Sequence, residues 1–333
     1  MSTKKPEIRI TPPKGALRRI TLPAAPPIST AGAKMPVPEQ IAAMVRAHAA
    51  WLENPADGRQ ADFSGMTLND MNLTDAALRR AILIGATLLD SNLAGADLSE
   101  AAMERIDAER ANLAGADLSG AALTNARFTG AWMHETNLTE VVATHTDFRS
   151  ARLTKARMFE ATVNDACFVQ VSAAGASFHQ SRFYDADFDS ASLEETVFYH
   201  ARLQHAKFTG VAASGASFAG SKIDHCDFAR ATLRRVNFSR AELIQCQFRY
   251  GDLHDCDFRE ARLRGGDFGR AVLAGSRFGQ AQLMMADFRG ADLTGARELT
   301  ADQLSQSLTD DRTILPNGSR GPYLRRSGAE KPR

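Results

Sequence analysis

Cysteine and histidine are the residues of this sequence best suited to chemistry, and some of them recur at a fixed spacing. The positions of Cys226 and Cys246 differ by twenty, as do those of His205 and His225, and Cys256 follows further along the chain. Thiolates and imidazoles bind zinc, and paired thiols support redox chemistry. Such a spacing brings these groups together only if the chain returns to the same place after each interval. Whether they form one site therefore depends on the elements that carry them.

Those elements follow from a repeat of five residues. A large apolar side chain occupies every fifth position from Phe63 to Leu293 without an insertion, which gives 47 consecutive centres. The centres that are small are Ala108, Ala143, Ala173 and Ala213. The residue two positions before each centre is nearly always small, and the other three are mostly polar or glycine. A period of five fits neither a helix, at about 3.6 residues, nor a strand, at about 2.

The pattern instead predicts one short extended side and one corner for each repeat. In an extended segment, residues two apart face the same way, so the centre and the small residue before it point inward together. The next two residues, often Ser-Gly, Arg-Gly or Thr-Gly, suit a turn. Four corners close a 20-residue ring, and stacked rings pair as parallel strands about 4.8 Å apart. About 12 such rings would form a coil roughly 55 Å tall.

The order of the large centres supports an even number of sides. From Phe178 onward, phenylalanine and leucine largely alternate along the repeats. This alternation on a four-sided ring places phenylalanine on two opposite walls and leucine on the other two. The predicted fold class is therefore an all-β solenoid with a filled axis.

This arrangement separates the groups that could do chemistry. Cys226, Cys246 and Cys256 occupy the small inward position, whereas His205 and His225 fall at outward corners. Buried cysteine is a good small apolar residue. We therefore predict no metal site, no cofactor and no catalytic residue.

Several repeats match a known motif letter for letter. The sequences "ADLSE" (96–100), "ADLSG" (116–120) and "ADLTG" (291–295) fit the pattern A(D/N)LXX. In these residues the chain resembles the pentapeptide-repeat family over residues 61–297. The resemblance implies a right-handed quadrilateral β-helix.

A coil of stacked strands exposes hydrogen-bonding edges at both ends, so caps are expected. The segment "PEQIAAMVRAHAAWLEN" (38–54) places its apolar residues on one helical stripe, and Thr300 and Gln303 have the spacing of a capping box. The predicted organisation is a disordered basic Pro-rich tail (1–37), a capping helix and turn (38–60), the β-helix (61–297), a short capping helix (298–308) and a disordered tail (309–333).

Composition limits the function classes. The net charge is +1 over 333 residues, which gives no overall bias toward nucleic acid or anionic membranes. No apolar run approaches the roughly 18 residues that a membrane span needs, and no secretory signal is readable. Four cysteines do not make a disulfide framework in a chain of this length. The expected location is the cytoplasm.

Because residues one ring apart lie above one another, outward side chains form columns. One predicted column is aromatic and faces outward at a corner on three successive rings. The candidate partner surface consists of Phe159, His179, Val197, Tyr199 and His200. A second candidate patch consists of Ile82, Ile84 and Leu89, which lies under the N-terminal helix or forms a dimer contact. Two interpretations of the aromatic column stay open: it stabilises the coil, or it docks a partner.

The leading hypothesis is a non-catalytic protein-binding or scaffold protein, because repeat solenoids offer long rigid surfaces and no preformed cleft. The expected partner is another protein, with no direct nucleic-acid binding, and homodimer formation is left open. One alternative that the resemblance implies is a DNA mimic that protects a topoisomerase. Residues 61–150 hold 13 acidic and 6 basic residues, but residues 151–297 hold 17 and 19. Another alternative is an accessory or effector protein of a bacterial secretion system, with the basic tail as a docking segment.

Overall fold

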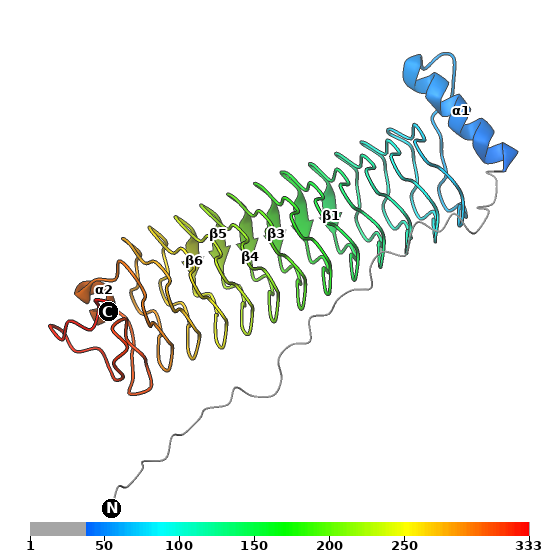
Figure 1. Ribbon diagram of the computed structural model, residues 1–333. Coiled ribbons are helices and arrows are strands. Elements are labelled where there is room, and N and C mark those ends of the chain that lie inside the picture. The colour runs from blue at the N-terminus through cyan, green and yellow to red at the C-terminus, as the bar shows by residue number, and fades with distance from the viewer. Residues whose placement is uncertain (1–37, 333) are drawn as a thin grey trace, which may run out of the picture. The chain divides into compact units, whose positions relative to one another are not determined.

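The computed structural model describes residues 38–332 of the chain. In this part the chain forms a helix, a long coil of stacked rings and a second, short helix (Figure 1). The basic tail predicted for residues 1–37 lies outside the described residues. The helices are α1 (Glu39–Glu53) and α2 (Ala301–Ser305), and the strands are β1 (Val142–Thr144), β2 (Thr162–Asn164), β3 (Arg182–Tyr184), β4 (Arg202–Gln204), β5 (Lys222–Asp224) and β6 (Glu242–Ile244).

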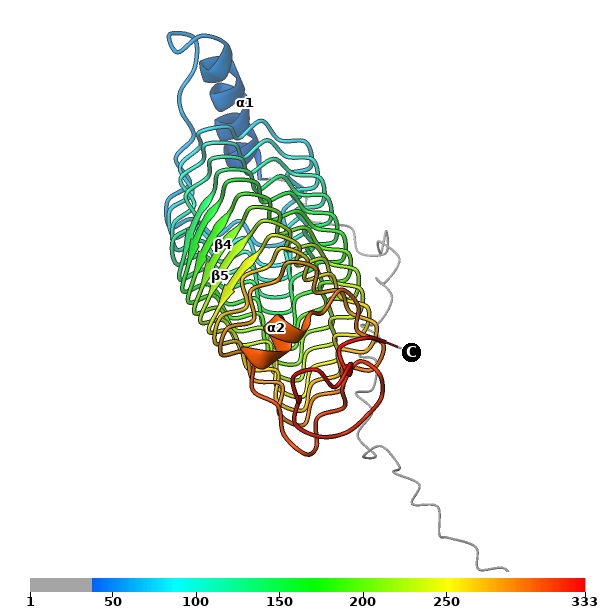
Figure 2. The same cartoon turned by 90° about the vertical axis from the view of Figure 1, so that its left-hand side faces the viewer.

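Parallel pairing at a constant 20-residue offset builds the coil. Bridges join Asp62 to Ile82 at the first ring and Val272 to Asp292 near the last, and every bridge between them keeps the same offset. Strands β1 to β6 form one parallel sheet in sequence order along one wall, on which β4 and β5 are labelled in Figure 2. The predicted fold class, the four-sided β-helix, is confirmed.

The corners depend on a left-handed backbone at the fifth residue of each repeat. Gly175 has a φ of 66°, and the non-glycine residue Gln180 has nearly the same value, 57°. This conformation is unfavourable for residues with a Cβ. It persists because the corner amide is held by the next ring: the Gln180 N–H donates to the Tyr199 carbonyl at 3.0 Å. The ladder of hydrogen bonds therefore imposes the turn even where the sequence lacks glycine.

The axis is filled by the predicted centres, all of which are buried. Phenylalanine rings stack along two opposite walls, for example Phe178 on Phe198 with centroids 4.7 Å apart. The two stacks meet edge to face, as Phe198 and Phe208 do at 6.0 Å and 85°. Phe63 and Phe183 are exceptions, since they lie on a wall that otherwise carries smaller centres. The interior is thus one continuous apolar cluster.

Helix α1 closes the first ring through a buried histidine. His48 Nε2 donates to the Arg79 carbonyl at 2.9 Å, and Nδ1 accepts from the Ala61 N–H at 3.0 Å. Both ring nitrogens are therefore satisfied in the neutral state. Burial lowers the pKa of His48, although its bond to the Arg79 carbonyl opposes the shift.

The C-terminal end differs from the prediction. Helix α2 has the expected capping box, in which the Thr300 N–H donates to Gln303 Oε1 at 2.8 Å, but it ends at Ser305. Residues 309–332, for which the sequence predicts disorder, pack onto the last ring. Ile314 pairs with Asp292, and the Thr313 hydroxyl donates to the Phe288 carbonyl at 3.0 Å. The physical reason is the unpaired edge of the final ring, whose backbone groups need partners.

Candidate functional site

The aromatic column (Phe159, His179 and Tyr199) is assembled by the coil as the spacing predicts. The rings of Phe159 and His179 stack with centroids 5.1 Å apart, and those of His179 and Tyr199 stack at 5.2 Å. Phe159 and His179 are half-buried, whereas Tyr199 is 41% exposed. All three are fourth residues of their repeats, so the corner turns their side chains outward while the centres fill the axis.

The two remaining residues of the candidate partner surface lie in the same repeat as Tyr199. Val197 is half-buried on the wall before the corner and is bridged to Ser177 and Ser217 on the adjacent rings. The exposed His200 ring lies edge-on against Tyr199, with centroids 4.0 Å apart. The position of the His200 imidazole depends on the glycine at position 220 in the next ring, because a Cβ on residue 220 would lie 2.9 Å from the imidazole. The structure brings four of the five predicted residues to one corner and Val197 to the wall that leads into it.

The second patch (Ile82, Ile84 and Leu89) is half-buried on the first rings of the coil. Helix α1 contacts the neighbouring residues of this region: His48 bonds to Arg79, and the Arg80 guanidinium lies 5.4 Å from the Trp51 ring. Cover of this patch by helix α1 and a dimer contact through it both stay predictions.

The cysteines and histidines are kept apart, as the inward and outward positions predict. Cys246 and Cys256 are buried, and their thiols donate to the carbonyls of Ile223 at 3.5 Å and Leu233 at 2.9 Å. Burial raises the pKa of Cys226 to about 12. His205 and His225 lie outside, with ring centroids 5.4 Å apart. Within residues 38–332, no three His, Cys, Asp or Glu side chains are grouped as metal ligands would be.

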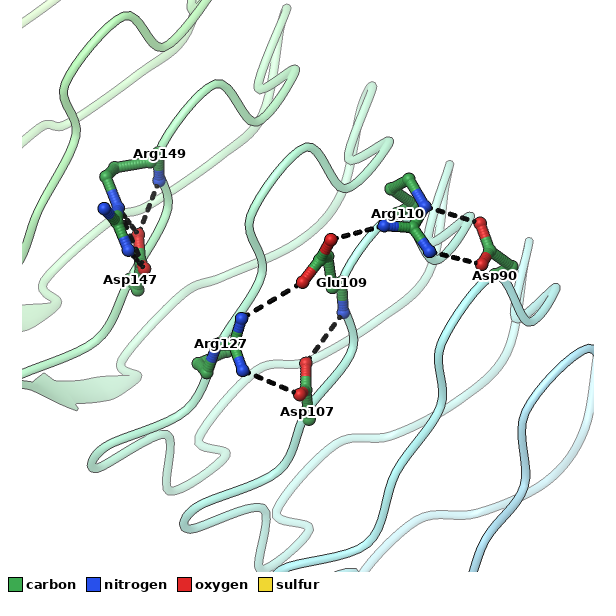
Figure 3. Close-up of polar contacts among 7 residues, drawn as sticks. All are labelled: Asp90, Asp107, Glu109, Arg110, Arg127, Asp147 and Arg149. Carbon is green, nitrogen blue, oxygen red and sulfur yellow. Dashed lines mark hydrogen bonds and ion pairs between the residues drawn. The ribbon is translucent and has the colours of Figure 1, made fainter.

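Many charged side chains of the outer surface pair with an opposite charge, either on a neighbouring ring or two residues away in the same ring (Figure 3). Arg110 donates to Asp90 through Nε at 2.8 Å and Nη2 at 2.6 Å, and Arg127 donates to Asp107 at 3.0 Å. The hydrogen bonds from Arg110 hold the pKa of the Asp90 carboxyl below its ordinary value. Opposite charges thus lie next to each other on neighbouring strands, an arrangement that stabilises a sheet.

One column of three cations makes no such ion pairs in the described residues and is not among the surfaces predicted from the sequence. The basic row (Arg182, Arg202 and Lys222) stacks three exposed cations at the first positions of β3, β4 and β5. The row lines a groove of about 430 Å³ that also contains Tyr184 and Gln204. The 20-residue spacing that places the aromatic column also places these three cations above one another, so the sequence carries the signal for this row.

A second hollow lies near the C-terminal end of the coil. It has a volume of about 320 Å³ and is lined by Tyr250, Arg270 and Asp310, among others. The Arg270 guanidinium lies 5.6 Å from the Tyr250 ring and donates to its hydroxyl at 3.2 Å. The two residues therefore form a cation–π contact between stacked rings of the coil.

No helix within the described part of the chain is both long and apolar enough to cross a lipid bilayer.

Comparison with known proteins identifies the repeats. A family model described as "Pentapeptide repeats (8 copies)" matches residues 59–88, 91–130, 121–158, 136–172, 252–290 and 267–297. A second model, described as "Pentapeptide repeat region", matches residues 181–255. No curated protein matches the chain.

Among solved structures, QnrB1, a plasmid-mediated fluoroquinolone resistance protein, is 20% identical with a TM-score of 0.38, over 51% of this chain and 92% of that one. HetL, a pentapeptide repeat protein involved in heterocyst differentiation regulation from the cyanobacterium Nostoc sp. strain PCC 7120, is 22% identical with a TM-score of 0.21. That match covers 81% of this chain and 97% of HetL. A pentapeptide repeat protein from the thylakoid lumen of Arabidopsis thaliana is 23% identical with a TM-score of 0.21, over 40% and 79% of the two chains.

Proposed function

The chain belongs to the pentapeptide repeat family, and from this premise we propose that it is a non-catalytic protein-binding scaffold. Its partner is another protein, which docks on the corner that carries the aromatic column. The function resides on the outer surface, because the axis of the coil is filled by one continuous apolar cluster.

The observation that carries this proposal is the ordered stack of Phe159, His179 and Tyr199 at an outward corner. The stacking holds each ring in place before a partner arrives, so little side-chain entropy is lost on binding. The few hot-spot residues that dominate a protein interface are enriched in aromatic residues such as tyrosine, and each costs about 2 kcal/mol or more of binding free energy when replaced by alanine. An ordered row of partly exposed rings therefore suits a docking strip better than a purely stabilising ladder, which would bury them.

Site-specific photocrosslinking tests the proposal in the cells that make the protein. A benzophenone amino acid replaces Tyr199 in one variant and Ser119 in another, since Ser119 occupies the same corner column four rings earlier. We expect a crosslink to another protein from position 199 and none from position 119. Equal crosslinking from both positions, or none from either, would contradict the proposal.

A triple variant links the crosslink to the aromatic rings. Replacing Phe159, His179 and Tyr199 with serine should abolish recovery of the crosslinked partner while the circular-dichroism melt moves by only a few degrees. The corresponding variant of the second patch, with serine at Ile82, Ile84 and Leu89, serves as the comparison and should retain the partner. Light scattering of the purified chain shows whether the partner is a second copy.

The alternatives have less support. A DNA mimic needs negative charge along most of its length, but residues 151–297 carry a small positive excess. An accessory or effector role in a bacterial secretion system would rest on the basic tail, which lies outside the described residues. A chain that begins at residue 38 tests that role: loss of the position-199 crosslink in this chain would transfer the docking function to the tail.

A further inference from the structure

We propose that the wall formed by β3, β4 and β5 binds a short extended acidic segment of the partner protein through the basic row. This inference rests on the proposed scaffold function and adds the chemistry of the partner. It is carried by the charge arrangement of Arg182, Arg202 and Lys222 and by the groove that they line.

The basic row concentrates positive charge on one wall of the coil. Arg182 pairs in register with Arg202, and Arg202 with Lys222, so three like charges stand on adjacent strands. Like charges directly opposite each other destabilise a sheet. Within residues 61–297, no other column of the 20-residue ring carries three cations in succession. On the next wall, by contrast, Asp187 of the neighbouring ring lies 3.6 Å from the Lys207 ammonium.

The protein does not neutralise this charge itself. In residues 38–332, no carboxylate lies within ion-pair distance of Arg182, Arg202 or Lys222, whereas carboxylates on the same wall are bound elsewhere. Asp224 contacts His225 at 2.8 Å, and Glu242 contacts Arg262 at 3.2 Å. The groove is thus lined by three cations and one engaged carboxylate. Its net charge is complementary to an anionic ligand.

Aromatic rings flank the basic row on both sides. Tyr184, 46% exposed, lies at one edge of the wall and meets His205 edge-on at 5.9 Å. Tyr199 lies at the corner on the other edge, shortly before Arg202 in the chain. A peptide along the row can therefore place acidic side chains on the cations and apolar side chains against these rings. Arg202 follows Tyr199 by three residues, so the basic row lies on the wall that begins at the corner of the aromatic column.

The length of the row favours a peptide over a nucleic acid. The Cα atoms of Arg182 and Lys222 are two strand spacings apart, or roughly 10 Å. In an extended peptide, alternate side chains on one face are about 6.7 Å apart, so two or three acidic residues at alternate positions span the row. The row ends at Thr162 on one side and at Glu242 on the other. A nucleic acid strand needs a longer basic track, commonly about 4–16 nucleotides per site.

Fluorescence anisotropy with the purified full chain tests the inference. The probe is a labelled peptide of sequence Glu-Val-Glu-Val-Glu, compared with Gln-Val-Gln-Val-Gln and with a ten-residue oligothymidylate, in 50 mM and 300 mM NaCl. We expect the acidic peptide alone to bind, and to bind more weakly at high salt. The triple variant Arg182→Gln, Arg202→Gln, Lys222→Gln should lose at least tenfold in affinity and should melt at an equal or higher temperature, because repulsion is relieved.

Lys207→Gln is the matched control, since Lys207 lies in the same ring on the next wall and is already paired with Asp187. Its affinity for the acidic peptide should stay within twofold. The inference is overturned if the acidic peptide does not bind at 1 mM in low salt, if Lys207→Gln loses as much affinity as the triple variant, or if the oligothymidylate binds tighter through the same three residues. The scaffold proposal is judged separately by the crosslink from position 199, which requires no acidic peptide.

Discussion

At the scale of single residues, the side chains that face the axis of the coil are the most closely packed. Phe238 is fully buried, stacks between Phe218 and Phe258 at 5.2 Å on each side, and meets Phe248 edge-on at 5.9 Å. The Phe238 side chain thus packs on phenylalanine both along its own wall and across the axis. A substitution of Phe238 therefore removes packing contacts with both adjacent turns of the coil.

We expect Phe238→Ala to lower the free energy of unfolding by about 3–5 kcal/mol, because it removes a large apolar side chain and leaves a cavity. Phe238→Asp should be more severe, since it buries an unpaired charge. Urea denaturation measures both changes. Tyr250→Ala, at a 52% exposed position, is the control and should cost much less. Equal losses at positions 238 and 250 would refute the burial of the centres.

The buried His48 predicts a specific pH dependence. Its pKa is lowered in the folded state, so the folded protein holds the neutral ring while the unfolded chain protonates near its ordinary pKa of about 6.5. The contribution to stability is therefore complete above that pH and is lost as the pH falls below it. Protonation of Nδ1 also removes the bond from the Ala61 N–H.

Melting temperatures at pH 8 and pH 5.5 check this expectation. The wild-type chain should be less stable at the lower pH, and His48→Gln should be less stable at pH 8 and respond less to acid. A wild-type melt that is unchanged between the two values would exclude His48 as the source.

At the scale of elements, the 20-residue ring is the structural unit, and each wall carries its own type of buried side chain. Removing residues 205–224 deletes one whole ring and leaves phenylalanine stacked on phenylalanine. Removing only residues 205–209 shifts every later repeat by one wall, so phenylalanine would stack on smaller aliphatic centres. We expect the 20-residue deletion to melt close to the wild-type temperature and the five-residue deletion to melt well below it. A larger loss from the 20-residue deletion would contradict the wall-specific core.

The elements differ in how far the sequence predicts them. The coil and its columns follow from periodicity, because the same five-residue environment recurs without interruption from Phe63 to Leu293. The packing of residues 309–332 could not be predicted in this way. That segment is polar and has no period, and it is ordered by pairing of Ile314 with the open edge at Asp292. The cause is a tertiary contact, which local composition does not encode.

The candidate site was likewise predictable only in part. The aromatic column needed only the 20-residue offset, which places Phe159 beneath His179. The basic row needed the same offset and, in addition, the knowledge that no neighbouring ring supplies a carboxylate in the described residues. That knowledge requires side-chain positions, since Asp224 is close in sequence to Lys222 but contacts His225 instead.

At the scale of the whole molecule, the charge distribution argues against imitation of a duplex. Residues 61–150 carry 13 acidic and 6 basic residues, and their carboxylates include Asp107, which is paired with Arg127 at 3.0 Å. We expect the purified chain not to inhibit supercoiling by a type II topoisomerase at stoichiometric concentration. Inhibition that disappears when Asp97, Asp107 and Asp117 are changed to asparagine would reverse this conclusion.

The constant 20-residue offset of the parallel pairs within residues 62–297 also gives the coil a mechanical character. A force applied to its two ends loads the rings in sequence, so the chain should peel from one end instead of shearing as a block. Each ring released frees one 20-residue turn, which extends to roughly 70 Å of contour. Single-molecule stretching should therefore give a regular sawtooth of that step, with the first force peak set by whichever cap, α1 or the α2 segment, yields first. The same repeat would let the protein lengthen under tension in equal increments.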